Sequence, residues 1–246
     1  MSLRLSLLGL LGVFLLVALW QAVVSLADLP RFILPGPLLV LEALWVNREL
    51  IAGHSLVTLA EVLMGMVLGA ALGFATAVSL AYSPTARNLV RPVLVFSQAV
   101  PVFALAPILT LWLGYGLLSK VAMAVLIIYF PVTSSFFDGL MRTPRGFLDL
   151  AGTMGASRGR QLLLVRIPSA MPSLASGLRL GAVYAPIGAV IGEWVGASKG
   201  LGYLMLLANG RVKIDLMFAA LLVLGLMAVL LYVMVDRLGH WMRHDA

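Results

Sequence analysis

Long runs of apolar residues, separated by short polar or proline-rich segments, dominate the chain. A helix that crosses a bilayer needs about 20 mostly apolar residues. Six stretches come near that length: Leu5–Leu26, Leu56–Tyr82, Val93–Leu113, Val121–Phe137, Ala170–Gly192 and Leu216–Val235. The runs are too long for core strands and do not alternate with a period of two, so the pattern predicts an all-α membrane protein with about six transmembrane helices.

The composition favours the same class. Of the 246 residues, 62% are hydrophobic and 11% are charged, whereas a soluble domain is about half apolar and about a quarter charged. A soluble fold of this length cannot bury so much apolar surface, which argues against a soluble enzyme or a nucleic-acid-binding module. The chain has no cysteine, which excludes a disulfide scaffold, an iron–sulfur cluster and a thiol nucleophile.

The distribution of the cationic residues predicts the topology. With both termini inside, the segments 83–92, 138–169 and 236–246 are cytoplasmic. Together with Arg4 they hold ten of the 17 cationic side chains, whereas the outer segments hold six and Arg179 lies within a span. This excess follows the positive-inside rule. The net charge of +7 therefore needs no nucleic-acid partner.

The first span and the proline-containing outer segment after it form a predicted N-terminal unit, residues 1–53. Ser25, Leu26 and Ala27 offer a plausible signal-peptide cleavage site. The apolar run before them is longer than the core of a usual signal peptide, which has about 7–15 residues. We therefore expect a retained transmembrane helix.

Small residues recur at helical spacing in the second span. Gly65, Gly69 and Gly73 are four residues apart, which predicts a face where another helix packs closely. This pattern leaves open whether the helices only pack or also slide. Prolines interrupt three later spans and predict kinks, which occur both in transport helices and in ordinary membrane helices. These prolines are Pro101, Pro107, Pro131 and Pro186.

The chain lacks the common motifs of hydrolytic chemistry. It has no GxxxxGK[ST] phosphate loop, no HExxH and no GxSxG, and its histidines do not have metal-ligand spacing. Two ionisable residues, Glu61 and Arg179, lie within spans. They are either relay groups, as in a secondary carrier, or side chains that extend to the nearest interface.

The longest cytoplasmic segment, 138–169, predicts a helical hairpin, with one short helix around Leu148–Gly155 and a second over Arg158–Arg166. Its sequence resembles the motif of permease subunits of binding-protein-dependent ABC importers: EAA, three residues, Gly, nine residues, then I-x-L-P. The matching residues here are Asp149-Leu150-Ala151, Gly155, and Val165-Arg166-Ile167-Pro168, and Ala156 and Ser157 are also similar. The sequence departs from the motif by Asp for Glu, Leu for the first Ala, Val for Ile and Ile for Leu.

The resemblance extends from about Leu56 to the C-terminus. It implies the type I permease (MetI-like) fold, with residues 54–246 as the permease core and 138–169 as the cytoplasmic coupling loop. It implies a subunit without its own ATPase site, in the inner membrane of a bacterium. An ABC ATPase subunit, which holds ATP and Mg, would grip the coupling loop. An extracytoplasmic solute-binding protein would deliver the solute, and two copies of the chain would form a homodimer.

Within this resemblance three residues of the loop have expected roles. Gly155 would permit a sharp turn after the first short helix. Asp149, expected near the start of that helix, would interact favourably with the helix dipole. Pro168 would fix the entry into the fifth span. No cofactor or metal is expected on this chain itself.

Residues 185–196 resemble most the permeases for a hydroxymethylpyrimidine-type thiamine precursor. The alternatives are import of a sulfonate, taurine, nitrate or riboflavin, or a membrane scaffold that moves no solute. The expected solute path contains polar and aromatic side chains that suit a planar ring, although each is equally suited to helix packing or to the membrane interface. These residues are Gln98, Tyr129, Tyr184, Glu193 and Trp194.

Overall fold

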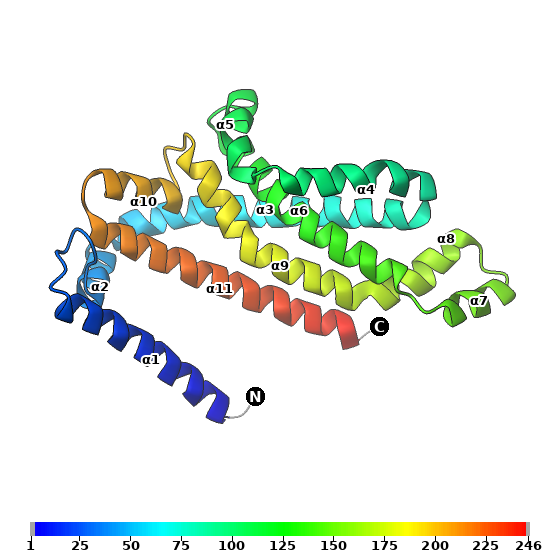
Figure 1. Ribbon diagram of the computed structural model, residues 1–246, viewed down its shortest axis with the longest axis horizontal. Coiled ribbons are helices and arrows are strands. Elements are labelled where there is room, and N and C mark those ends of the chain that lie inside the picture. Colours follow the sequence, from blue (N-terminus) through cyan, green and yellow to red (C-terminus); the bar gives the residue numbers. More distant parts are fainter. Residues whose placement is uncertain (1–2, 245–246) are drawn as a thin grey trace.

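The computed structural model describes the backbone of residues 3–244 and their side chains, apart from those of 3–8, 10, 98 and 241–244. All regular elements in this part are helices, and the long ones run along the longest axis of the molecule (Figure 1). In chain order they are α1 (Leu3–Leu26), α2 (Pro37–Val46), α3 (Arg48–Tyr82), α4 (Pro84–Ala99), α5 (Val102–Leu113), α6 (Leu117–Met141), α7 (Arg145–Thr153), α8 (Arg158–Gln161), the π-helical segment η1 (Leu162–Arg166), α9 (Ile167–Trp194), α10 (Leu201–Gly210) and α11 (Ile214–His244).

Four helices of the described part are long and apolar enough to cross a membrane: α3, α6, the continuous helix from α8 to α9, and α11. The bent pair of α4 and α5 is a fifth span if it is counted as one. α1 is an apolar helix of 24 residues at the place of the first predicted span. The prediction of an all-α membrane protein is therefore confirmed.

The predicted third span is not a single helix. It is divided at Val100 and Pro101 into α4 and α5, which are bent by 100° relative to each other. Proline lacks the backbone N–H that a continuing helix needs, and it pushes the preceding residue into extended conformation. Val100 accordingly has φ −81° and ψ 120°.

Two other boundaries differ from the prediction. α3 begins at Arg48 rather than at Leu56, so the second span is preceded by an extra two turns of helix. The predicted second helix of the cytoplasmic hairpin, Arg158–Arg166, is not separate. It joins α9 through η1 in one continuous helix, Arg158–Trp194, of 37 residues.

α6 forms the centre of the bundle because α3 and α9 pack against two of its sides. The three glycines at helical spacing on α3 lie on the face that contacts α6. A Cβ added at Gly69 would lie 3.0 Å from Ile128, which leaves no room for a side chain. The facing pairs along these two helices are Gly65–Ala124, Gly69–Ile128 and Gly73–Val132.

α9 approaches α6 in the same way from another side. A Cβ added at Gly188 would lie 2.8 Å from the Cα of Ala124. The facing pairs are Gly188–Ala124, Gly181–Ile128 and Gly177–Val132. The same three residues of α6 are thus enclosed by glycine faces of both neighbours, and each of the three is fully buried.

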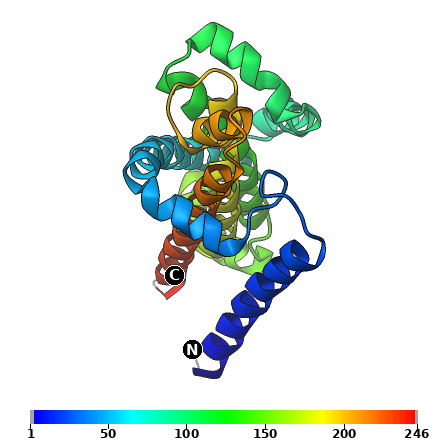
Figure 2. The same ribbon diagram turned by 90° about the vertical axis from the view of Figure 1, so that its left-hand side faces the viewer.

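The segments predicted to be cytoplasmic lie at one end of the bundle. The start of α4, the α7–α8 hairpin and the C-terminal end of α11 share this end, whereas α2 and α10 lie at the opposite end (Figure 1). We call these the cytoplasmic end and the outer end. α1 extends away from the bundle (Figure 2) and contacts it through α2 and through Trp20, whose ring lies 6.0 Å from that of Phe218.

Candidate functional site

At the cytoplasmic end, α7 projects beyond the ends of the long helices (Figure 1) and has no buried residue. Two apolar side chains of α7 and one just after it are exposed. They are Phe147 by 58%, Leu150 by 59% and, after the helix, Met154 by 79%. The spacing i, i+3, i+7 places them on one face of the helix. We call these three residues the α7 stripe. An exposed apolar stripe on a projecting helix is typical of a surface that another protein covers.

The turn after α7 depends on Gly155, whose φ is +80°. The N–H of Gly155 donates to the carbonyl of Gly152 at 2.9 Å, and the N–H of Ala156 donates to the carbonyl of Ala151 at 2.9 Å. This pair of bonds is the Schellman motif that ends a helix. A residue with a Cβ is strained at this φ, so glycine permits the reversal that brings the chain back toward the bundle.

Two side chains hold the base of the hairpin. Ser157 precedes α8, and its hydroxyl accepts from the N–H of Arg160 at 3.4 Å. Gln161 donates from Nε2 to the carbonyl of Ala156 at 3.2 Å and so ties α8 to the turn. Sequence reasoning missed Gln161, because a polar residue in a basic segment looks like an exposed one. It also missed Phe147 and Met154, although their spacing with Leu150 is visible in the sequence.

The other loop residues that the sequence predicts as coupling residues differ in how deeply they are buried. Val165, in η1, and Ile167 and Pro168, in the first turn of α9, are half-buried where the hairpin meets the bundle. Pro168 does not mark a separate entry into the fifth span, since the helix is continuous there. Asp149 is exposed.

The predicted effect of Asp149 on the helix dipole is wrong. α7 begins at Arg145, and its first turn has no acidic residue. Asp149 therefore lies in the middle of the helix, too far from the N-terminus for the dipole to act, since this effect falls off within the first turn.

The residues expected to line a solute path lie in different settings. Tyr129 is half-buried, and its hydroxyl is 3.1 Å from that of Thr76 on α3. Tyr184 and Trp194 are 42% and 51% exposed on α9. Gln98 belongs to α4, but its side chain lies outside the described part. Glu193 is buried at the outer end and is bound on both oxygens.

Glu193 lies in the last turn of α9 and is 1% exposed. Its Oε1 accepts from the hydroxyl of Thr58 at 2.6 Å. Its Oε2 accepts from the N–H groups of Gly202 at 2.5 Å and Tyr203 at 3.3 Å, which lie in the first turn of α10. A carboxylate at this place satisfies free N–H groups and complements the positive end of the helix dipole. Glu193 thus fastens α10 to α9 and α3.

The loop before α10 is held by further bonds to α3. The N–H of Leu201 donates to the Thr58 hydroxyl at 2.8 Å, and the N–H of Gly200 donates to Nδ1 of His54 at 3.0 Å. The His54 ring stacks on Tyr203 at 5.9 Å. No local pattern indicates this role of His54, because its partners are about 145 residues away in the chain.

Two ionisable side chains are buried close to Glu193. Glu61 and Lys120 are each 2% exposed, and they line a cavity of about 170 Å³ together with Ser198 and Lys199. Lys120 donates from Nζ to the carbonyl of Tyr115. The Glu61 side chain is therefore buried beside α6 and the loop before α10, at the outer end. Its two interpretations, a relay group or a side chain near the interface, stay predictions.

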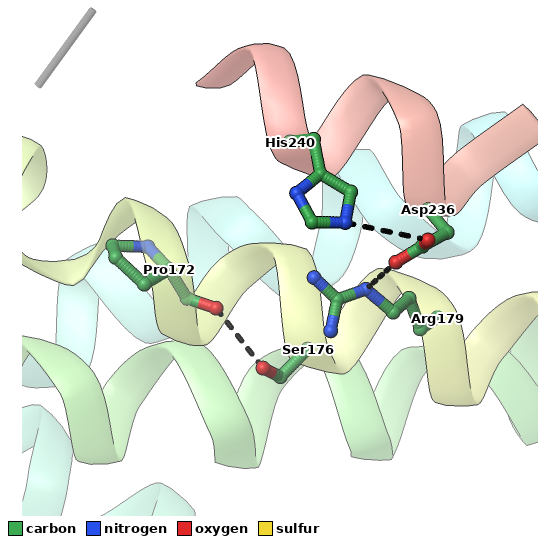
Figure 3. A network of polar contacts seen from close by, with 5 residues as sticks. All are labelled: Pro172, Ser176, Arg179, Asp236 and His240. Carbon is green, nitrogen blue, oxygen red and sulfur yellow. Dashed lines mark hydrogen bonds and ion pairs between the residues drawn. The ribbon is translucent and has the colours of Figure 1, made fainter. Parts of the chain in front are cut away.

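Arg179 is also paired within the protein. Its Nε lies 2.8 Å from Oδ1 of Asp236 on α11, and Nε2 of His240 lies 3.5 Å from the other oxygen of Asp236 (Figure 3). The Arg179 side chain is 22% exposed. The ion pair joins α9 to α11 near the cytoplasmic end.

Comparisons with known proteins agree with this architecture. The family model of the binding-protein-dependent transport system inner membrane component matches residues 56–244. A probable ABC transporter permease protein of Haemophilus influenzae is 51% identical over 231 residues, which are 94% of each chain. The formylaminopyrimidine transport permease protein ThiX of Halalkalibacterium halodurans is 35% identical, over 91% of this chain and 90% of ThiX. The riboflavin transport system permease protein RibX of Chloroflexus aurantiacus is 38% identical, over 89% of this chain and 83% of RibX.

A solved structure of the methionine ABC transporter MetNI in inward-facing conformations shares the fold. The TM-score is 0.66 at 19% identity, over 85% of this chain and 98% of that chain. The expected MetI-like fold is thus confirmed. The chain belongs to the family of inner-membrane components of binding-protein-dependent transport systems, and it is a permease subunit of an ABC importer, a multi-pass inner-membrane protein that leaves ATP hydrolysis to a separate subunit.

Proposed function

We propose that two copies of this permease subunit form the pore of an importer for a pyrimidine-type thiamine precursor, and that the α7 hairpin receives the movement of the ATPase. The α7 stripe carries this proposal, because three exposed apolar side chains on a helix without a buried residue need a partner surface. ATP and Mg would be held by the ATPase subunit.

The connection of the hairpin to the bundle suits it to transmit a movement of the ATPase to the membrane helices. α8, η1 and α9 form one helix, so a force on the hairpin base acts directly on a long helix of the bundle. α9 is in turn packed against α6 without intervening side chains at Gly177, Gly181 and Gly188. Close backbone packing of this kind transmits a displacement as a rigid-body shift, because a packed core does not deform gradually.

The homodimer is supported by an exposed stripe on α9. Leu180, Val183, Tyr184 and Ile187 are 42–49% exposed at helical spacing, and Trp194 follows farther along the same helix. A second copy that contacts this stripe through a two-fold axis would form the simplest closed assembly. Tyr184 and Trp194 would then lie where the two copies meet, with aromatic faces for a planar solute.

The choice of solute is supported by the relative ThiX, whose name states formylaminopyrimidine transport. The relative RibX favours riboflavin as the second candidate. Both solutes are planar nitrogen heterocycles, which suits an aromatic path better than a charged one.

A reconstituted importer tests these proposals. The permease, its ATPase and its solute-binding protein are placed in vesicles, and ATP-dependent uptake of formylaminopyrimidine, riboflavin and taurine is measured. We expect uptake of the pyrimidine, and uptake of only riboflavin or taurine would overturn the choice of solute.

The same vesicles test the hairpin with Leu150→Glu, which places a charge in the α7 stripe. We expect loss of ATPase co-purification and at least a tenfold loss of uptake. The control is Arg145→Glu, whose position on the helix is roughly opposite to the stripe. Normal ATPase association of Leu150→Glu, or equal losses in both variants, would contradict the proposed role of the stripe.

A further inference from the structure

A basic pocket lies at the cytoplasmic end, at the base of the hairpin. Its volume is about 290 Å³. It lies between the α3–α4 junction, the end of α6 and the start of the long α8–α9 helix. Its polar and boundary residues are Tyr82, Arg87, Met141, Arg158, Gln161 and Arg166.

The pocket carries three positive charges, and no carboxylate of the described residues forms an ion pair with them. Among the described side chains, none of Arg87, Arg158 and Arg166 forms an ion pair, and the ion pairs of this part join other residues. The Arg166 guanidinium donates from Nη1 to the sulfur of Met141, at 3.8 Å. Three arginines around one small pocket attract an anion and offer planar hydrogen-bond donors that suit a phosphate group.

Arg87 also forms hydrogen bonds that hold the end of α3. Its Nε donates to the carbonyl of Leu80 at 3.1 Å, and its Nη2 donates to that of Ala81 at 3.4 Å. Its guanidinium lies 5.6 Å from the centre of the Phe137 ring. Arg87 therefore caps the C-terminal end of α3, which fixes one wall of the pocket in place.

The pocket lies at the level where the spans end. Tyr82 is the last residue of α3 and Met141 the last residue of α6. Beside the pocket, Leu163 and Leu164 of η1 are 62% and 72% exposed. The arginines of the pocket therefore lie at the height of the lipid headgroups, and an apolar surface lies next to them.

We propose that this pocket binds the phosphate of an anionic phospholipid from the cytoplasmic leaflet. Basic pockets between membrane helices on the cytoplasmic side suit such headgroups. The lipid phosphate would join the α3–α4 junction to α8 and η1, and so steady the base of the hairpin. An acidic side chain of the ATPase is the competing occupant. The observations favour the lipid, because no residue of α7 lines the pocket and its walls are the ends of spans.

Native mass spectrometry of the purified importer, released from vesicles of phosphatidylglycerol and phosphatidylcholine, tests the proposal. We expect the wild type to retain phosphatidylglycerol in preference to phosphatidylcholine. The double variant Arg158→Gln, Arg166→Gln should retain it at least tenfold less, because each substitution removes a charge-assisted hydrogen bond to the phosphate. The matched control is Arg142→Gln, Arg160→Gln, which removes two exposed cytoplasmic charges outside the pocket and should retain the lipid as the wild type does.

Three results would overturn the proposal. Equal retention of both lipids by the wild type would show no headgroup selection, whatever the variants do. If inorganic phosphate at millimolar concentration displaces the lipid, and the wild type does not prefer phosphatidylglycerol, the pocket would be assigned to free phosphate. Loss of ATPase co-purification in the pocket variant, with lipid retention unchanged, would assign it to the ATPase.

Discussion

At the scale of single residues, Glu193 holds together the helices of the outer end. Its two oxygens accept from Thr58 on α3 and from Gly202 and Tyr203 on α10. A buried carboxylate is unfavourable unless such donors surround it. Gly200 is required beside it, because its φ is +113° and a Cβ there would overlap the carboxyl group. The geometry therefore gives Glu193 a holding function rather than free access to a solute.

Thr58→Val tests this network. Thr58 is fully buried and both donates to Glu193 and accepts from Leu201. Loss of the hydroxyl should lower stability by about 2–3 kcal/mol, since hydrogen bonds to charged groups are strong and the buried partners stay unsatisfied. Thermal unfolding of the detergent-purified protein measures the effect. Thr58→Ser keeps the hydroxyl and should stay near wild type. A loss in Thr58→Ser as large as that in Thr58→Val would contradict the assignment of the effect to the hydroxyl.

At the scale of elements, the glycine faces of α3 and α9 decide how closely these helices approach α6. In a bilayer the hydrophobic effect does not drive helices to associate, because lipid tails are as apolar as the side chains. Dispersion between closely packed helix surfaces therefore holds them together. Ala124, Ile128 and Val132 contact both glycine faces. The bend of 100° between α4 and α5 is a second feature of this scale. It turns α5 away from the direction of α4 (Figure 1), and α5 packs against α6 and α9.

Gly69→Leu tests the contact of α3 with α6. A Cβ at this position would lie 3.0 Å from two carbons of Ile128 and 3.3 Å from the carbonyl oxygen of Val125. The helices must separate, and overpacking of this kind costs about 1–3 kcal/mol. A lower unfolding temperature in detergent is the expected result. Gly53→Leu on the same helix, where nothing lies within 4 Å, serves as the control. It should not lower the unfolding temperature, because leucine is a better helix former than glycine, and an equal loss there would show that the contact with α6 is not the cause.

At the scale of the whole molecule, the two ends have different chemistry. The outer end has a buried network of Glu61, Lys120 and Glu193, and the cytoplasmic end has the α7 stripe and the arginine pocket. α6 and α9 connect the ends through the centre of the bundle (Figure 1). The two ends are thus joined by helices that approach each other closely at the glycines of α9.

The proposed dimer is tested by cysteine crosslinking, for which the chain is well suited because it has no cysteine. Tyr184→Cys on the exposed stripe of α9 should form a disulfide-linked dimer under mild oxidation in native membranes, visible on a non-reducing gel. Leu226→Cys, which is exposed by 56% on α11, is the control and should stay monomeric. Crosslinking of the control but not of Tyr184→Cys would place the interface on α11.

Local patterns in the sequence predicted most of the helices. Apolar runs of membrane length locate α3, α6, α9 and α11, because a chain in lipid must satisfy its backbone hydrogen bonds within each helix. The glycine spacing predicts the face of α3 toward α6. The turn at Gly155 follows from the resemblance to the permease motif, and its positive φ explains why glycine stands there. The break at Pro101 was less clear, since prolines at 107, 131 and 186 remain inside helices.

The sequence by itself thus determined the membrane class, the arginine-rich end, the helices and the hairpin motif, because each depends on residues that are near one another in the chain. Only the tertiary structure decided that Glu193 is a buried anchor, that His54 and Thr58 hold the loop before α10, and that Arg87 and Arg166 face one pocket. These partners are far apart in the chain. Their meeting depends on how α3, α6 and α9 pack, and a local pattern does not contain that information.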